Sequence, residues 1–351
     1  MSRLTRQLLC TALAVSVCAG TAGAQLLGGV SLPAVGLPAQ AGNLPVAGPV
    51  LRNVLGSPQV QQQVVAPTLD TIQGLPASVA DSGSSTLAEL RRMRLEELVR
   101  ENRPLLETDE RGQPVRRGVL VVADPDPQSL QLALRAGFSL AAQDFEPALG
   151  MRIVTLGTPP RMGVREALKR LHAIAPQLRA DYDHVFEPAG GSLAPLSAAL
   201  ASVAGAGNGR IIGMIDGGVA SHPSLAGTAI EQNGFAGAPK PTGHGTAVAS
   251  LLVGNQGPFR GAASGAQLFV ADVYGGSRAA GSSSAIVRAL GWLASRHPQV
   301  INISLVGPQN VAVARAIDAV QRRGIRVVAA VGNDGPAAPP QYPASTLVSS
   351  R

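Results

Sequence analysis

The sequence predicts an α/β protein in which a parallel sheet flanked by helices is preceded by a small α+β domain. After residue 210, runs rich in Val and Ile alternate with segments of helical periodicity, which is typical of buried parallel strands joined by helices. Before it, a strand–helix–strand–strand–helix–strand order spans about 70 residues, which is typical of a ferredoxin-like domain. Hydrophobic residues make up 45% of the 351 residues, which is enough for a sizeable core.

Residues 1–24 have the features of a secretory signal peptide. Two arginines precede the apolar run Leu8–Ala19, and the small residues Ala22-Gly23-Ala24 form a cleavage site. The run is too short to cross a bilayer, so we expect a secreted or periplasmic protein without a membrane span. A buried N-terminal helix is the alternative. Both cysteines lie in this segment, which excludes disulfides and cysteine-zinc sites from the mature chain.

Four segments are expected after the signal peptide. Residues 25–84 form a low-complexity leader in which Gly and Pro interrupt any period. Residues 85–190 combine the α+β domain with a preceding helix, which the capping-box pattern at Thr86 predicts. Residues 191–209, rich in Ala, Ser and Gly, form a linker, and residues 210–351 form the parallel-sheet domain.

The individual elements follow from periodicity and from Gly or Pro at their ends. In the α+β domain we expect, in strand–helix–strand–strand–helix–strand order, Gly118–Ala123, Gln128–Gly137, Phe138–Phe145, Met151–Leu156, Val164–Ile174 and Tyr182–Phe186. In the parallel-sheet domain the expected strands are Arg210–Ile215, Gln267–Val273, Val300–Ile303 and Ile325–Val331. The expected helices there are Thr246–Val253, Ser283–Arg296 and Asn310–Arg323.

The net charge of +7 does not indicate a nucleic-acid-binding protein. The excess lies in residues 205–351, which hold 11 basic and 5 acidic side chains, but the arginines are scattered and aromatic residues are only 3% of the chain. Nucleic-acid binding favours clustered basic side chains with interleaved aromatic residues. We therefore expect no nucleic-acid partner.

Three polar side chains stand at or near the carboxyl ends of predicted parallel strands, where the sites of α/β sheets form. Asp216 directly follows a strand, His244 lies between glycines at the start of a helix, and Asn333 lies in a Gly-Asn-Asp-Gly turn after another strand. Taken singly, each is also typical of a turn former or a structural residue. Their occurrence together in one order favours a catalytic site.

The motifs around these residues resemble those of the subtilisin-like serine proteases, the subtilases. The four motifs are IIGMIDGGVASHPSL, GHGTAVASLLVG, VINISLVGP, and VVAAVGNDG with QYPAS, and the resemblance covers residues 210–346. Roughly residues 115–190 resemble the propeptide that assists folding of subtilases and inhibits them. The resemblance implies a subtilisin-like sheet, polypeptide substrates, an intramolecular propeptide and no cofactor. It leaves a structural calcium ion open, although no acidic cluster has the spacing of a dedicated loop.

The resemblance also implies roles for individual residues. His244 is expected to act as general base, with Asp216 orienting and stabilising its imidazole. Asn333 is expected to donate its side-chain amide to the oxyanion of the tetrahedral intermediate. The substrate-binding residues are expected to be Ser304, Leu305 and Gly307, on a strand edge that pairs with an extended peptide.

The sequence departs from the family pattern at several positions. Gly217 replaces the usual Ser or Thr after the aspartate, and Val306 replaces the glycine that often follows Ser-Leu. The motif Gly-Thr-Ser-x-Ala, which carries the nucleophile in the family, does not occur before Arg351. We therefore expect a truncated, nearly inactive peptidase domain with no nucleophile, no metal site and an uncovered apolar sheet edge.

Two alternatives remain open. The first is a non-catalytic pseudoprotease, or a propeptide-type protease inhibitor or folding chaperone. The second is an unrelated secreted α/β binding protein, which would have to carry the four ordered motifs by coincidence.

Overall fold

The computed structural model describes residues 77–189, 207, 209–333 and 339–349, which belong to one compact unit, Leu75–Arg351. The predicted signal peptide 1–24, most of the leader 25–84 and nearly all of the linker 191–209 lie outside these residues. The structure therefore bears on the two folded domains and on the helix before them.

The helix before the first domain is longer than the sequence predicts. Helix α4 (Ala77–Glu101) begins well before Thr86, so the predicted leader boundary at residue 84 falls inside it. Alanine and serine between Ala77 and Thr86 tolerate helical geometry, and a proline precedes the first helical residue, where it needs no hydrogen-bonded N–H. Leu95 and Leu98 are buried, which holds the described end of α4 on the protein.

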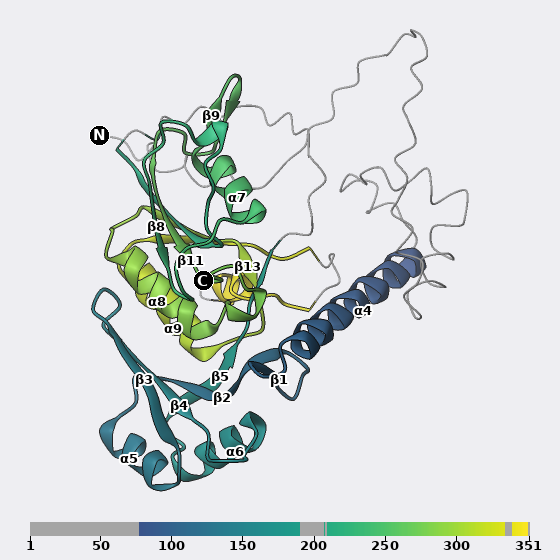
Figure 1. Ribbon diagram of the computed structural model, residues 1–351, viewed down its shortest axis with the longest axis vertical. Helices are drawn as coiled ribbons and strands as arrows, with labels where there is room; N and C mark the ends of the chain where they lie inside the picture. Colours follow the sequence, from purple (N-terminus) through teal and green to yellow (C-terminus); the bar gives the residue numbers. More distant parts are fainter. Residues whose placement is uncertain (1–76, 190–206, 208, 334–338, 350–351) are drawn as a thin grey trace, which may run out of the picture. The chain divides into compact units, whose positions relative to one another are not determined.

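The first domain is a five-stranded antiparallel sheet with two helices on one face (Figure 1). Its strands are β1 (Leu106–Thr108), β2 (Pro114–Ala123), β3 (Ser139–Glu146), β4 (Met151–Gly157) and β5 (Arg179–His184). Its helices are α5 (Pro127–Arg135) and α6 (Val164–Ile174). The strand order β5-β2-β4-β3, with the short β1 also on β2, confirms the ferredoxin-like arrangement. The predicted last strand, Tyr182–Phe186, is wrong at its end, because β5 stops at His184.

The second domain is built on a parallel sheet, as the sequence predicts. The sheet order is β14-β12-β7-β11-β8, and every pairing in it is parallel. The strands are β7 (Ile211–Asp216), β8 (Ile230–Gly234), β11 (Gln267–Asp272), β12 (Val300–Ile303) and β14 (Arg326–Ala329). The sequence does not predict strand β8, because this strand is an exposed edge strand of mostly polar residues.

The remaining elements are mostly helices and short pairs of strands. The helices are α7 (Gly243–Val253), α8 (Ser283–Ala294), α9 (Val311–Arg322) and α10 (Ala344–Ser349), with single 3₁₀ turns η2 (Pro223–Leu225) and η3 (Arg278–Ala280). Strands β9 (Asn255–Gln256) and β10 (Phe259–Arg260) form a hairpin, and β6 (Glu187–Pro188) pairs with β13 (Leu305–Val306).

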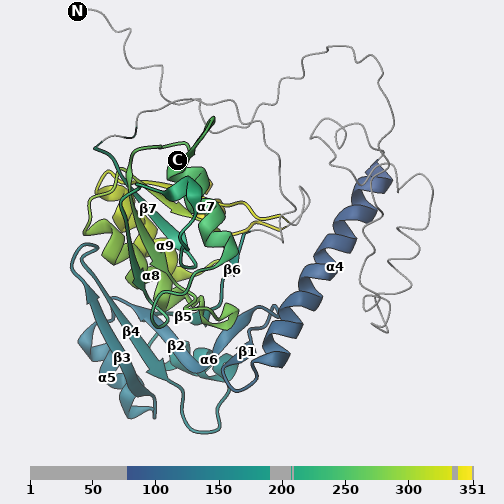
Figure 2. The ribbon, with the colours of Figure 1, turned by 45° about the horizontal axis from the view of Figure 1, so that its top comes forward.

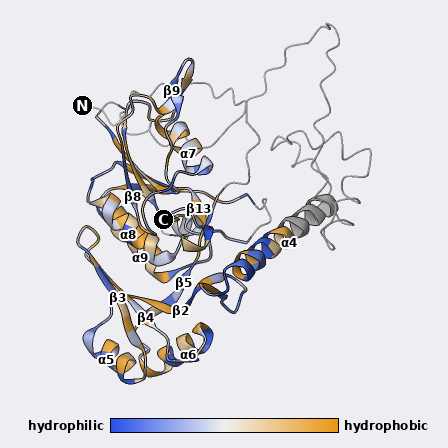
Figure 3. Ribbon diagram, in the orientation of Figure 1, coloured by the Kyte–Doolittle hydropathy of each residue, from blue (hydrophilic) through white to orange (hydrophobic). Residues whose placement is uncertain are grey.

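Helices α8 and α9 lie between the two sheets (Figures 1 and 2). They contact β7, β11 and β14 of the parallel sheet and β2, β3 and β5 of the antiparallel sheet. Helix α8 therefore buries residues on nearly all sides, and Figure 3 shows it as mainly hydrophobic, in contrast to the hydrophilic described part of α4. A helix that is apolar on all sides must be buried on both faces. The parallel sheet packs on one face of α8, and the antiparallel sheet of the first domain packs on the other.

Side chains of β5 cap both sandwiched helices. The Asp183 carboxylate accepts hydrogen bonds from Ser284 N (2.9 Å), Ser284 Oγ (2.9 Å) and Ser283 Oγ (3.0 Å) at the start of α8. The Asp181 carboxylate accepts one from Val311 N (2.9 Å) at the start of α9. Free N–H groups and the positive end of the dipole make helix N-termini favourable partners for carboxylates. The two domains are thus joined by polar contacts as well as by the core.

Candidate active site

Asp216 lies at the carboxyl end of the central strand β7 and is 1% exposed. Its Oδ1 accepts a hydrogen bond from Gly217 N (2.6 Å). A Cβ atom at Gly217 would lie 2.6 Å from Oγ1 of Thr242, so the absence of a side chain at position 217 has a steric reason. Thr242 is the N-cap residue of α7 and accepts a hydrogen bond from Gly245 N (3.0 Å).

His244 stands in the first turn of α7 and faces Asp216. Its Nδ1 lies 2.8 Å from Oδ2 and 3.0 Å from Oδ1 of the aspartate. A Cβ atom at Gly245 would lie 2.4 Å from the carbonyl oxygen of Gly217, so only glycine allows α7 to approach the end of β7 this closely. The structure thus brings together the two residues that the sequence analysis named as base and orienting carboxylate.

Electrostatics within the pair favour a charged imidazole. The hydrogen bond with Asp216 raises the pKa of His244 above its usual value, while burial of the ring acts in the opposite direction. Asp216 holds the Nδ1 side of the ring, which leaves Nε2 as the nitrogen that can exchange a proton with a reacting group. This is the arrangement that a general base assisted by a carboxylate requires.

The remaining nitrogen of His244 meets the chain's own backbone. Nε2 lies 3.2 Å from the carbonyl oxygen of Ala189. Ala189 ends an extended segment that contains β6 and lies against β13 in antiparallel register, with Pro188 opposite Leu305 and Glu187 opposite Val306. Ala189 N donates to the carbonyl oxygen of Ser304 (3.0 Å). The strand edge predicted to bind substrate is therefore paired with residues 187–189.

The same segment is also held on its other side. Phe186 N donates to the carbonyl oxygen of Gly281 (2.8 Å), and Val185 bridges Ser282. The ring of Phe186 is fully buried, and a Cβ atom at Gly307 would lie 2.5 Å from it. Gly307, predicted as a substrate-binding residue, thus contacts an aromatic side chain of this segment.

Asn333 lies on the loop after β14, beyond the carboxyl edge of the same sheet, and its side chain is exposed. Gly332 before it has a φ of +88°, which favours glycine. A Cβ atom at Gly332 would lie 3.7 Å from Cγ1 of Val306, which places this loop next to β13. The predicted oxyanion residue therefore lies on a loop that borders β13.

Comparison with known proteins agrees with this geometry. Residues 207–348 match the Subtilase family. We call residues 207–348 the subtilase segment, after the family that they match. Over 143 residues it is 34% identical to Subtilisin Savinase of Lederbergia lenta, which covers 39% of this chain and 52% of that protein. Over 130 residues it is 37% identical to Subtilisin DY of Bacillus licheniformis, with 35% and 47% covered. The chain spans about half the length of these curated relatives.

The fold of the subtilase segment has a counterpart among solved structures. Fervidolysin from Fervidobacterium pennivorans superposes with a TM-score of 0.50 at 17% identity, covering 62% of this chain and 40% of that chain. At this identity the match supports the fold alone. It confirms the predicted subtilisin-like arrangement of a parallel sheet flanked by helices.

The serines near the start of α8 have structural roles in the subtilase segment. Ser282 is the N-cap residue of α8 and accepts a hydrogen bond from Ala285 N (3.2 Å), and its two successors bind Asp183. The three serines therefore cap α8 and bind a carboxylate of the first domain. His244 bonds Asp216 and the Ala189 carbonyl rather than a serine hydroxyl.

The described residues show neither a metal-binding cluster nor a membrane-spanning helix. Among these residues, no group of three or more His, Cys, Asp or Glu side chains is arranged to hold a metal ion. Within the same ranges, no helix combines the length and the apolar character needed to cross a bilayer.

Sequence reasoning missed three residues of this site: Thr242, Phe186 and Ala189. Thr242 carried a usable signal, since a threonine directly before Gly-His-Gly-Thr is a favourable helix N-cap. Phe186 and Ala189 carried none, because their place in the cleft depends on docking of the first domain on the second.

Proposed function

We propose that this chain supplies the Asp216–His244 pair of a secreted subtilase-type serine endopeptidase, together with the propeptide that blocks it. The observation that carries the proposal is the extended segment at residues 185–189. It pairs with β13 as a peptide substrate would, and it directs the Ala189 carbonyl at Nε2 of His244, 3.2 Å away. A bound peptide in this geometry presents the carbonyl group of its last residue to the catalytic base.

In this function His244 takes a proton from a serine nucleophile and later protonates the leaving amine, while Asp216 stabilises the imidazolium. Asn333 donates its amide to the oxyanion. Ser304, Leu305 and Gly307 hold the peptide by strand pairing and by contact with the side chain at the position of Phe186. Residues 85–190 act as the propeptide, and cleavage would take place in the 187–209 region.

The polypeptide of residues 1–351 by itself is expected to be nearly inactive. Its sequence holds no Gly-Thr-Ser-x-Ala motif, and in subtilisin loss of the serine alone lowers turnover by about two million-fold. The 351-residue chain should therefore remain uncut after removal of a signal peptide. A self-generated N-terminus near residue 200 in pure protein would contradict this expectation.

Sequencing of the gene past codon 330, with translation of all three frames, tests the proposal. We expect Gly-Thr-Ser-x-Ala to be encoded downstream, and the product that contains it to hydrolyse casein in a manner abolished by His244→Ala. If no frame encodes the motif, the proposal fails, and the result favours the alternative that the protein is a pseudoprotease or a propeptide-type inhibitor. That alternative predicts stoichiometric inhibition of an active subtilisin by the full chain.

A further inference from the structure

One carboxylate in the cleft-bound segment is held by two arginines. The side chain of Glu187, in β6, is only 5% exposed. Arg278 Nη2 lies 2.5 Å from its Oε1, and Nε and Nη2 of Arg94 lie 3.3 Å from its Oε2. Arg278 belongs to the turn η3 of the subtilase segment, whereas Arg94 belongs to helix α4. Two segments far apart in sequence thus meet at one buried charge.

A buried carboxylate is unfavourable unless it is paired, so these contacts determine whether Glu187 can occupy its place. The backbone fixes that place independently. Glu187 lies opposite Val306 in the β6–β13 pair, and the neighbouring Ala189 is bonded to both Ser304 and His244. Strand pairing therefore places Glu187 two residues before Ala189, whose carbonyl oxygen contacts His244.

Arg278 remains 55% exposed even with Glu187 bound. Its guanidinium belongs to the subtilase segment, and the turn η3 that carries it packs on the first domain through Ala279, which clusters with Leu98 and Leu106. A peptide that paired with β13 in place of β6 would bring the side chain at its Glu187 position next to the guanidinium of Arg278. An acidic side chain would form the ion pair, and a basic one would meet a like charge as it lost water.

We propose that Arg278 makes this cleft selective for peptides with Glu or Asp at the position occupied by Glu187. This inference rests on the proposed function, because it requires that the edge of β13 binds peptides. Arg94 adds a second cation at the same position. The covalent link gives the chain's own segment a high effective concentration, which favours it over peptides from other proteins.

The test uses the full chain and three fluorescein-labelled peptides, Val-Phe-Glu-Pro-Ala and its variants with Gln or Lys in third place. Glu187→Lys places a cation between two arginines and should release the chain's own segment. The release should appear as at least tenfold faster hydrogen exchange of the amides of Phe186 and Ala189. The Glu peptide should then bind this variant at least about tenfold more tightly than the Lys peptide, with the Gln peptide between them.

Charge reversal at the arginine isolates its role. In the double variant Glu187→Lys/Arg278→Glu, the chain's own segment should dock again and slow the exchange of both amides. In the double variant Glu187→Gln/Arg278→Glu, the Lys peptide should bind more tightly than the Glu peptide. Arg260→Glu is the matched control, because Arg260 lies in the same segment and binds only the carbonyl groups of Gly257 and Phe259. Combined with Glu187→Gln, it should leave the order of the peptides unchanged.

The outcomes separate this inference from the proposed function. Equal binding of the three peptides, unaffected by Arg278→Glu, would overturn the selectivity and leave the peptide cleft in place. Failure of every peptide to bind variants that are released and still folded by circular dichroism would overturn both. Glu187→Gln guards against misfolding of the Lys variant, since it removes the charge at nearly constant volume and should release the segment to a smaller extent.

Discussion

The side chain of Thr242 fills the space beside Asp216 that a side chain at position 217 would need. A Cβ atom at Gly217 would lie 2.6 Å from Oγ1 and 2.7 Å from Cγ2 of Thr242. Gly217 stands where the subtilase pattern usually has Ser or Thr. The structure shows that a hydroxyl is nevertheless present next to position 217, contributed by Thr242, the N-cap residue of α7.

This relationship predicts that Gly217→Ser destabilises the protein. The new side chain would collide with Thr242, and overpacking of this kind costs about 1–3 kcal/mol. Urea unfolding followed by circular dichroism measures the loss. Thr242→Ala in the Gly217→Ser background should recover part of it. Gly243→Ala is the control, because a Cβ atom there would meet nothing within 4 Å. Equal losses for the two glycine variants would contradict the steric interpretation.

A second prediction concerns the titration of His244. Asp216→Asn removes the negative charge that raises the pKa of the imidazole, so that pKa should fall. Because the folded-state pKa is raised, the pair stabilises the protein fully below the unfolded value of about 6.5 and loses this contribution as pH rises through the folded pKa. NMR titration of the histidine resonances, together with stability curves from pH 5 to 9, measures both effects.

The control for that experiment is Asp318→Asn, which neutralises an exposed carboxylate paired with Arg322 and should leave the pKa of His244 unchanged. An unchanged pKa of His244 in Asp216→Asn would show that the aspartate does not hold the charged ring.

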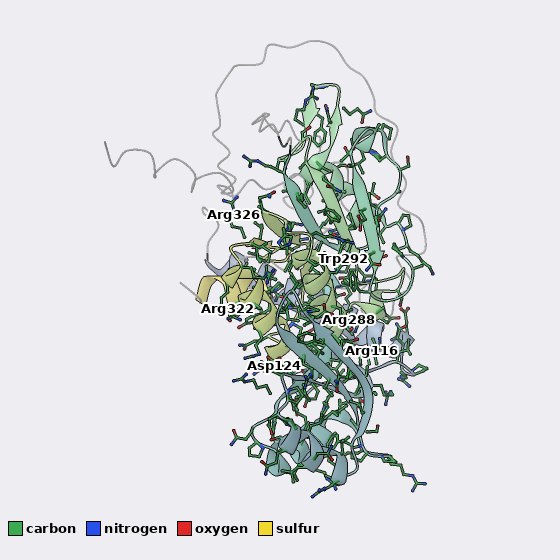
Figure 4. The ribbon with its side chains drawn as sticks, turned by 90° about the vertical axis from the view of Figure 1, so that its left-hand side faces the viewer. Arg116, Asp124, Arg288, Trp292, Arg322 and Arg326 are labelled. Atoms are coloured by element: carbon green, nitrogen blue, oxygen red, sulfur yellow. The ribbon has the colours of Figure 1, made fainter. Side chains whose placement is uncertain are left out.

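Glu146 gives a third prediction, at the contact between β3 and α8. Glu146 lines a pocket of about 540 Å³ together with Arg288 and Trp292. These two α8 residues lie close together in Figure 4. The pKa of Glu146 is raised from 4.5 to about 7, mainly by burial and also by the charge of Asp144, while Arg288 opposes the rise. Because the folded-state pKa is the higher one, the contribution of this group to stability should be greatest below pH 4.5 and be lost as pH rises through about 7.

Glu146→Gln should remove this part of the pH dependence, since the amide stays neutral. Stability measured by urea unfolding between pH 4.5 and 8 should then vary less in the variant than in the wild type. Glu166→Gln, on the exposed face of α6, is the matched control. Parallel curves for the wild type and Glu146→Gln would refute the role of this carboxyl group.

A fourth prediction tests the caps that β5 places on α8. Asp183→Ala leaves the amide and hydroxyl groups of Ser284 without their buried acceptor. An unsatisfied buried donor costs about 1–3 kcal/mol, so the free energy of unfolding should fall by that amount. Asp318→Ala, which removes an exposed carboxylate paired with Arg322, should change it by less than about 0.5 kcal/mol. A similar loss in both variants would show that the contact with α8 is not responsible.

Much of the fold could be predicted because its signals are local. Helix α6 and strand β12 have the predicted bounds, since each is a short periodic run closed by Gly, Pro or a polar residue. The candidate pair Asp216 and His244 could be named from motifs that lie next to such runs. Strand β8 and the start of α4 could not, because an exposed polar edge strand and a helix of weak periodicity leave no such signal.

The sequence by itself was enough to predict the order of most elements, the likeness of residues 207–348 to the subtilases and the candidate pair Asp216 and His244. Only the tertiary structure decided what surrounds them: Thr242 beside Gly217, Asp183 on α8, and the Phe186–Ala189 segment in the cleft with Glu187 at Arg278. The physical reason is separation along the chain. Periodicity and caps arise between near neighbours, whereas these contacts join residues 25 to about 120 positions apart and exist only once the first domain and the loops have docked.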